Sequence, residues 1–123
     1  MFSKTTTRTG TNPSNQARAI KVLWEYIVKD DHRDQFIAIY SPDGAWSKLF
    51  SKHPGFIRTE LIQDSSNPNR FVTIDHWVSL SAYSDMKHRS RNEYKAIDEH
   101  CEVFTVDENY IGVFELLSDR QHP

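Results

Sequence analysis

The hydrophobic and polar positions along the chain follow two different periods, which predict strands and helices in turn. Residues 20–28 are β-branched and aromatic throughout, so we expect a central strand with both faces largely covered. Residues 56–64 and 70–79 alternate as half-buried strands, and the short turn cluster at 65–69 joins them into an antiparallel hairpin. A last strand is expected at residues 107–117.

Two helical regions separate these strands, and each is predicted to consist of two segments. The first begins near residue 31, and Ser41 is placed to cap a second segment that starts at Pro42. In the other region, Ser79 can cap one helix, and residues 90–93 read as a capping box that begins the next. The element order is therefore βαββαβ, which predicts an α+β, ferredoxin-like antiparallel sheet with helices on one face.

The strand at residues 70–79 places unlike side chains on its two faces. Phe71, Asp75 and Trp77 alternate with an aliphatic set. We expect the aliphatic set to face the helices, and the aromatic and acidic set, with Phe56 and Glu60 of the preceding strand, to face away from them. An acid beside aromatic rings suits a semi-polar space, so this face is predicted to pair with a second copy of the chain.

Length and charge limit the classes of function. At 123 residues and a net charge of −2, the chain has the size of one domain and lacks the basic field that nucleic-acid binding requires. The core-forming pattern covers residues 20–117; residues 1–19 are expected to be a flexible arm, with an organelle transit peptide as the alternative, and residues 118–123 an exposed tail.

The compartment is expected to be cytoplasmic. Cys101 is the single cysteine, which excludes an internal disulfide and is typical of a reducing environment, and its place in a helical pattern predicts a buried thiol. No apolar run approaches the roughly 20 residues that a membrane span needs. The histidines show no metal-site spacing, and we expect neither a metal nor a cofactor.

Several stretches carry a resemblance to a known family: "VLWEYIVK", "PGF" before a strand, "RFVTIDHWVSLSAY" and the closing "YIGVFE". Together they resemble the antibiotic biosynthesis monooxygenase family of dimeric α+β barrel proteins, over about residues 20–116. The resemblance implies a homodimer in which two open sheet faces form a closed barrel, with a small-molecule pocket in each subunit. The chain matches the haem-degrading members of the family only in part: Trp77 matches by position and His88 lies on the following helix, but the first strand lacks their Asn.

By this resemblance, the expected activity is a cofactor-independent monooxygenation of a small aromatic or quinone-like compound. That chemistry needs a base in an apolar surround, where the pKa of a carboxyl group is raised. The candidate catalytic residues are Asp75, as the base, and His88, as a second proton-handling group. The candidate pocket residues are Trp77, Glu60, Phe71, Trp24 and Tyr83.

The same residues allow other interpretations. The acids can pair with neighbouring arginines and line a wet interior, and the aromatic residues, including Trp46, Tyr26 and Tyr94, can simply be core. The alternative function is a non-catalytic, dimeric small-molecule binding or sensing protein with the same fold. A third possibility is a purely structural dimer, whose pocket is filled by its own aromatic side chains.

Overall fold

Strand β1 (Ile20–Val28) lies inside a four-stranded antiparallel sheet in the computed structural model, which describes residues 18–118. The sheet order is β2-β3-β1-β4, with β2 at Phe56–Gln63, β3 at Arg70–Trp77 and β4 at Thr105–Glu115. The predicted central position of β1 is confirmed. Its two faces are not equally covered within the chain, since the even-numbered residues are buried and the odd-numbered ones are only half-buried.

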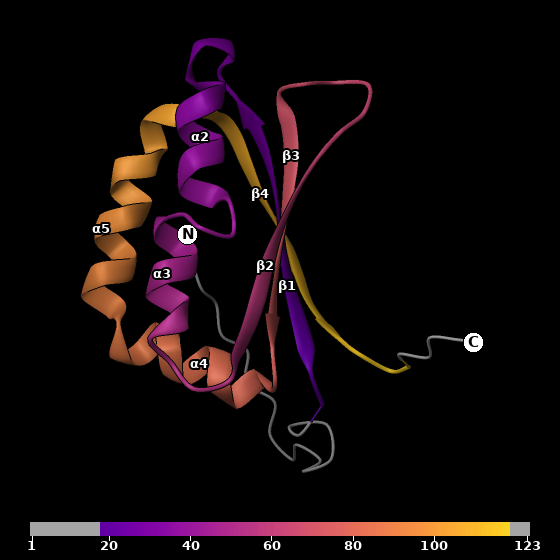
Figure 1. The fold of residues 1–123 in the computed structure, drawn as a ribbon, viewed down its shortest axis with the longest axis vertical. Helices are drawn as coiled ribbons and strands as arrows, with labels where there is room; N and C mark the ends of the chain where they lie inside the picture. The colour runs from indigo at the N-terminus through magenta and orange to yellow at the C-terminus, as the bar shows by residue number, and fades with distance from the viewer. Residues whose placement is uncertain (1–17, 119–123) are drawn as a thin grey trace.

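The helices form a second layer on one face of the sheet, which leaves the other face open (Figure 1). The first helical region comprises the short 3₁₀ helix η1 (Asp30–His32), α2 (Arg33–Tyr40) and α3 (Ala45–Ser51). The second comprises α4 (Leu80–Arg89), α5 (Arg91–Cys101) and the 3₁₀ helix η2 (Glu102–Phe104). The predicted α+β, ferredoxin-like βαββαβ order is thus confirmed, as is the division of both helical regions.

Two of the three residues predicted to cap helices occupy N-cap positions, and one of them makes the side-chain cap hydrogen bond. Ser79 Oγ accepts a hydrogen bond from the Ala82 amide at 3.1 Å at the start of α4. The predicted cap at Ser41 is wrong, because α3 begins at Ala45 with Gly44 as its N-cap. Ser90 is the N-cap of α5, as predicted, and Glu93 hydrogen-bonds to it. The Ser90 hydroxyl, however, lies 2.7 Å from His53 Nε2 and makes no cap hydrogen bond, so the predicted capping box forms only in part.

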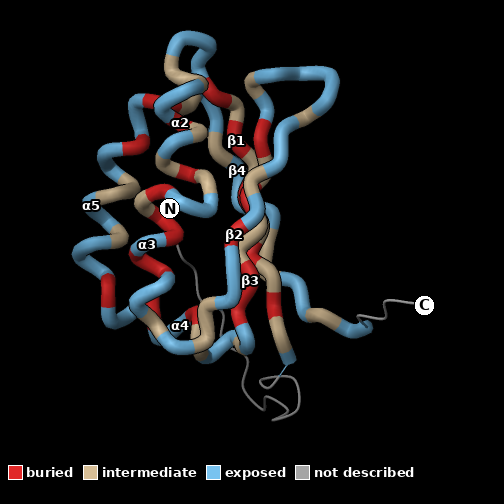
Figure 2. The backbone as a smooth tube through the Cα atoms, in the orientation of Figure 1, coloured by how far each residue is buried: buried red, intermediate tan, exposed pale blue. Residues whose placement is uncertain are grey.

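The core lies between the two layers, where the buried residues gather, while the outer surfaces of the helices are exposed (Figure 2). Aromatic rings fill most of it. Phe36 and Tyr40 stack with ring centroids 4.1 Å apart, and Trp77, at 0% exposure, contacts the rings of Phe50 and Phe56. This density of rings under the helices determines which sheet positions face inward.

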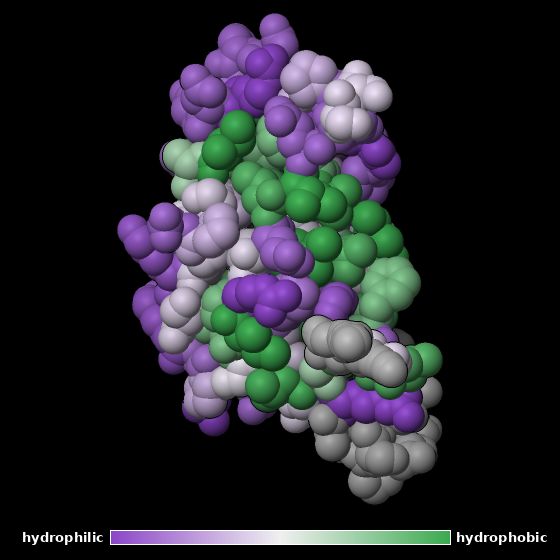
Figure 3. Space-filling view, turned by 45° about the vertical axis from the view of Figure 1, so that its right-hand side comes forward, coloured by the Kyte–Doolittle hydropathy of each residue, from purple (hydrophilic) through white to green (hydrophobic). Residues whose placement is uncertain are grey.

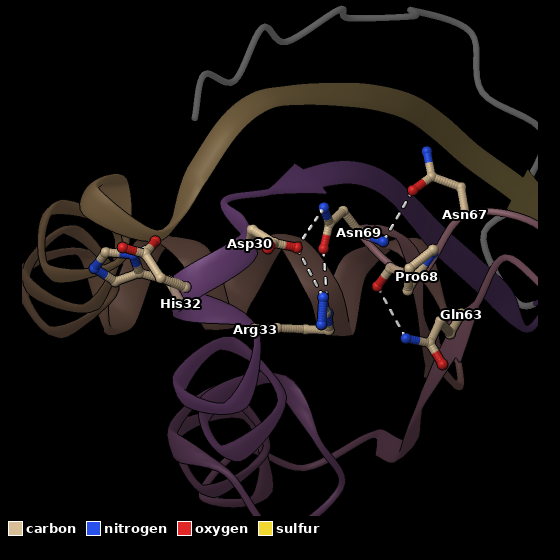
Figure 4. A network of polar contacts seen from close by, with 8 residues as sticks. Asp30, His32, Arg33, Gln63, Asn67, Pro68 and Asn69 are labelled. Carbon is tan, nitrogen blue, oxygen red and sulfur yellow. Dashed lines mark hydrogen bonds and ion pairs between the residues drawn. The ribbon is translucent and has the colours of Figure 1, made fainter.

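A polar network ties the loop between β2 and β3 to the start of the first helical region (Figure 4). Arg33 donates to Asn69 at 3.1 Å and to Asp30 at 2.9 Å, and the Asn69 side chain donates to the same Asp30 oxygen at 3.2 Å. Within the loop, Gln63 donates to the carbonyl of Pro68 at 2.9 Å. The network holds the hairpin end beside α2.

The predicted arm at residues 1–19 and the predicted tail at 118–123 lie almost entirely outside the described residues. Between residues 18 and 118, no helix has both the length and the apolar character that crossing a membrane requires.

Candidate functional site

Asp75 lies on the face of β3 that meets the helices. Its strand partners are Val22 on β1 and Thr59 on β2, and both of these residues are buried under the helical layer. Directly paired residues of antiparallel strands share one face, so all three side chains point toward the helices. Thr59 Oγ1 donates a hydrogen bond to Asp75 Oδ1 at 2.7 Å.

This orientation corrects the predicted assignment of the sheet faces. Phe71 and Trp77 are buried on the helix side with Asp75, whereas Val72 and Ile74 lie on the open face. The prediction is wrong because both faces of β3 are largely apolar, and a period of two separates two sets without saying which set is inside. The larger aromatic set fills the space under the helices.

Phe56 is likewise on the helix side, since a register irregularity follows it. Phe56 pairs with Trp77, whereas Arg58 pairs with the next residue along β3, His76, so Ile57 is an extra residue in β2. Only Glu60 faces away from the helices as predicted. It pairs with Ile74, and its Oε1 lies 2.8 Å from His76 Nε2.

A cavity reaches Asp75 between the sheet and the helices. Its volume is about 30 Å³, and it is partly open to solvent. Six aromatic residues line it: Trp24, Tyr26, Tyr40, Trp46, Phe50 and Tyr94. These rings come from β1, α2, α3 and α5, so the cavity depends on both layers. A ring-sized ligand enters only if some of these side chains rotate.

Three carboxyl groups line this cavity together with the aromatic rings. Burial raises the pKa of Asp75 from its ordinary value of 3.8 to about 7, and the hydrogen bond from Thr59 opposes that rise only in part. Asp98 of α5 and Glu108 of β4 also line the cavity. Burial, together with the nearby charge of Asp98, raises the pKa of Glu108. No Lys, Arg or His is among the lining residues.

Trp46 is a buried residue of the cavity lining and is 8% exposed. Its side chain interacts with the Tyr40 hydroxyl and the Cys101 thiol, where it opposes in part the rise in pKa that burial causes in both groups. A carboxyl group with a pKa near neutrality among aromatic rings suits the binding and deprotonation of a small aromatic molecule.

The structure brings two of the predicted site residues together, Asp75 and Trp24. The other predicted pocket residues lie elsewhere. Trp77 and Phe71 are core residues, and Tyr83 packs on Trp77 at a centroid distance of 5.9 Å without lining the cavity. Glu60 lies on the opposite sheet face.

His88, the second predicted catalytic group, is an exposed residue in the last turn of α4 and does not line the cavity. Within residues 18–118, no cluster of three or more His, Cys, Asp or Glu side chains could hold a metal ion.

Sequence reasoning missed the acids at the far side of the cavity. Asp98 lies four residues after Tyr94, so it shares the inward face of α5 with that aromatic residue. The available signal for Asp98 was an acidic residue among the apolar residues on one face of the predicted helix. Glu108 gave no comparable signal, because the inward register of β4 is set by its pairing with Tyr26.

A larger hollow of about 270 Å³ lies near the start of α4 and is lined by Pro54, Gly55, Val78 and Ala82, with His53 and Arg89 among its polar residues. It contains no buried acid. We place the candidate site at the smaller cavity because the pKa of its carboxyl group is shifted toward neutrality and its lining is aromatic.

A four-stranded antiparallel sheet with helices on one face defines the fold class of this protein, a ferredoxin-like α+β domain with an aromatic, acid-containing cavity between its layers. The profile of the antibiotic biosynthesis monooxygenase family matches residues 19–99, which is more than half of the chain. The chain belongs to this family.

Solved structures show the same fold at low sequence identity. SnoaB from Streptomyces nogalater, a cofactor-independent oxygenase solved in a point-mutant form, superposes with a TM-score of 0.67 at 17% identity, covering 86% of this chain and 97% of that one. A conserved protein from Methanosarcina mazei Go1 superposes with a TM-score of 0.62 at 18% identity, and the match covers 84% of this chain and 97% of that one. A candidate antibiotic biosynthesis monooxygenase from Nitrosomonas europaea superposes with a TM-score of 0.64 at 15% identity, and the match covers 83% of this chain and 93% of that one. A search of curated protein sequences finds no match.

Proposed function

We propose that this protein is a cofactor-independent monooxygenase that acts on a small aromatic or quinone-like compound, with Asp75 as the general base. The observation that carries the proposal is the carboxyl group of Asp75, whose burial at an aromatic cavity raises its pKa to about 7. A base is most effective when its pKa lies near the working pH. Membership of the monooxygenase family and the fold shared with SnoaB support the same chemistry.

The reaction uses dioxygen as the co-reactant and the substrate as the source of electrons. Asp75 removes a proton from an activated C–H group beside a phenolic ring, which leaves a carbanion. The carbanion forms a C–O bond with dioxygen, and the peroxide takes up the proton. Loss of water, with the second C–H proton, gives a C=O group, so that CH₂ and O₂ become C=O and H₂O. Thr59 holds the carboxylate in place through its 2.7 Å hydrogen bond.

The aromatic lining keeps bulk water away from this carbanion and offers π faces for stacking. Because the volume of the cavity is only about 30 Å³, we expect the substrate to displace some of these rings when it enters. We expect Trp24 and Trp46 to report that movement by a change in fluorescence.

We further propose that the active form is a cytoplasmic homodimer paired through the open sheet face. This face carries Leu23, Ile27, Ile62, Val72, Ile74 and Phe114, of which Ile62 and Phe114 are each 50% exposed. In Figure 3, hydrophobic residues gather over the sheet with polar residues between them. An apolar face of this extent is typical of an interface between subunits. The cytoplasmic location rests on the single, buried thiol of Cys101.

Oxygen consumption tests the proposed activity. The purified protein is given phenols, hydroquinones and a hydroxyanthrone in an oxygen-electrode cell, with the rate in buffer subtracted. Asp75→Asn should lower kcat by about 10²–10⁴-fold, the usual contribution of a general base. Glu60→Gln is the matched control, because Glu60 is a carboxylate on the neighbouring strand whose side chain faces away from the cavity, and it should retain the rate within about twofold. An unchanged rate in Asp75→Asn contradicts the assignment.

The small volume of the cavity favours a second candidate, a non-catalytic dimeric protein that binds or senses a small molecule. A space of about 30 Å³ suits a ligand with one small buried group better than a fused ring system. This alternative predicts saturable ligand binding, recovery of the ligand unchanged and no enzyme-dependent oxygen uptake with any member of the substrate panel.

A further inference from the structure

The aromatic rings that line the cavity are not equally deep in the protein. Five of them are at most 8% exposed: Trp24, Tyr26, Tyr40, Trp46 and Phe50. The sixth, Tyr94 of α5, is half-buried, which makes it the most accessible ring of the lining within residues 18–118. A molecule that approaches the cavity from solvent therefore meets the Tyr94 ring before it meets the others.

Tyr94 lies between a core ring and a positive charge. The Trp46 ring meets it edge to face, with centroids 4.9 Å apart and an interplanar angle of 68°. Lys87 of α4 places its Nζ 5.6 Å from the centroid of Tyr94 and 5.3 Å from that of Tyr83. A cation within about 6 Å of a ring centroid is attracted to the negative face of the ring. Lys87 therefore stabilises the present position of the Tyr94 ring.

The surroundings of Lys87 strengthen this contact and also allow its release. Burial lowers the pKa of Lys87, and the charge of Asp98 opposes that change and attracts the ammonium group. A cation–π contact is stronger where the cation is partly removed from water. The lysine side chain is nevertheless long and flexible, so its charged end can move into solvent without disturbing the core.

A substrate ring needs more space than the cavity of about 30 Å³ provides, so one lining ring must move. Most of the rings are fixed by the core. Two lie on the inner strand β1, the Trp46 side chain interacts with Tyr40 and Cys101, and Phe50 packs on the ring of Trp77. Tyr94 is half-buried on a helix, and a change of its side-chain rotamer moves its ring toward solvent.

The small volume also determines the state of the ring in the complex. Because a bound ligand occupies the space that the Tyr94 ring now fills, the ring stays displaced while the ligand is bound. The contact between Lys87 and Tyr94 is then made only in the closed state. A contact of this kind lowers the fraction of molecules that are open, and it weakens the apparent affinity for a ligand by the same factor.

We propose, on the basis of the proposed function, that Tyr94 is the entry gate of the cavity and that Lys87 is the positioning residue that holds this gate closed. The substrate enters by displacing the Tyr94 ring from the Lys87 ammonium group and from the edge of Trp46. Between turnovers, the closed ring keeps bulk water from the carboxyl group of Asp75.

Quenching of tryptophan fluorescence by acrylamide tests the gate in the full chain without any ligand. Trp24 and Trp46 line the cavity, so the quencher reaches them when the gate is open. Lys87→Met removes the charge and keeps an unbranched side chain, and it should raise the quenching constant by about two- to fivefold, the usual strength of one cation–π contact converted into a population. Lys87→Arg keeps the cation and should behave like the wild type.

The matched control is Lys95→Met, which removes the same charge from an exposed lysine of α5 that pairs with Glu99 outside the cavity. It should leave the quenching constant unchanged. If Lys87→Met behaves like Lys95→Met, the proposal is overturned.

Tyr94→Ala removes the gate itself and should raise the quenching constant at least as much as Lys87→Met does. In this background, Lys87→Met should have no further effect, because its contact with Tyr94 is already lost. An equal effect of Lys87→Met with and without the Tyr94 ring contradicts the gate. Circular dichroism shows whether each variant is folded. If Tyr94→Ala does not fold, the comparison of Lys87→Met, Lys87→Arg and Lys95→Met still decides.

Oxygen uptake separates this proposal from the proposed function. If a hydroquinone is oxygenated in an Asp75-dependent reaction, Lys87→Met should lower its KM by the same two- to fivefold and leave kcat within about twofold. If that reaction is found but Lys87→Met changes neither the quenching constant nor KM, the gate is wrong and the activity stands. If the quenching results are as expected but no compound of the panel consumes oxygen, the gate stands and the monooxygenase is wrong.

Discussion

Asp75 and Glu60 lie on adjacent strands of one sheet, and their side chains point to opposite faces. On the helix side, burial raises the pKa of Asp75 to about 7. On the open side, Glu60 accepts a hydrogen bond from the His76 ring, which lowers its pKa, and its side chain is 45% exposed. The two carboxyl groups thus respond in opposite directions to environments that are one strand apart.

The difference shows that the pKa of a carboxyl group in this sheet depends on which face its side chain occupies, and not on which strand carries it. Under the helices there is no basic side chain in the cavity lining to stabilise the ionised form of Asp75, so the carboxyl group holds its proton near neutral pH. On the open face, His76 and the charges of Arg58 and Lys21 stabilise the ionised form of Glu60. The first environment suits proton transfer, and the second suits a polar pair beside the proposed subunit interface.

The largest expected effect on stability comes from the helix side. Trp77→Ala removes a fully buried ring that contacts Phe50 and Phe56, and it should lower the free energy of unfolding by about 3–5 kcal/mol in urea titrations. Ile74→Ala, on the open face, should change the unfolding of the isolated subunit by about 1 kcal/mol or less and instead weaken the dimer, as measured by sedimentation. Equal losses from both variants would contradict the separation of the two faces.

The pH dependence of stability should separate the two acids. Because the pKa of Asp75 is higher in the folded chain than in the unfolded chain, the folded state binds more protons between pH 4 and 7, and stability falls as the pH rises through that range. The total loss is roughly 4 kcal/mol. Asp75→Asn should remove this slope and make the variant more stable than the wild type at pH 8, in thermal unfolding followed by circular dichroism. If the stability of the wild type does not change between pH 4 and 7, ionisation of Asp75 does not destabilise the folded state, which contradicts this prediction.

The smallest effect is expected at Glu60. Its lowered pKa means that its contribution to stability is present above its ordinary pKa of 4.5 and is lost as the pH falls through the lower folded value. Because the side chain is 45% exposed, solvent screening keeps this contribution below about 1 kcal/mol. Glu60→Gln should therefore change stability slightly at pH 7 and not at all at pH 2, in the same unfolding assay. A loss as large as that from Trp77→Ala would place Glu60 in a buried network.

The sequence predicted the elements better than it predicted the site. Strand β1 was predicted at Ile20–Val28, as observed, because β-branched and aromatic residues fill it without interruption. The cap at Ser79 was also predicted correctly. The cap at Ser41 was not, because a turn that reaches Gly44 comes before the helix, and a tertiary contact with His53 takes the hydroxyl of Ser90.

The site depended on information that local patterns do not contain. Asp75 was identified from an acid between aromatic residues, and that observation holds on either face of the sheet. Which face meets the helices is decided by how the rings of α2, α3 and α5 fit against β1 and β3, which is a property of the packed layers. Glu108 reaches the cavity through the pairing of β4 with β1, across more than eighty residues of chain. Pairing over such a distance leaves no local signal.

The central claim is that the cavity under the helices holds a carboxyl group that exchanges its proton near neutral pH. The most direct test is a ¹³C NMR titration of the aspartate side-chain carboxyl groups in the labelled protein, with Asp75→Asn used to assign the Asp75 signal. The account predicts a transition near pH 7 that is absent from the variant. A transition of Asp75 near pH 4, like that of an exposed aspartate, would contradict it.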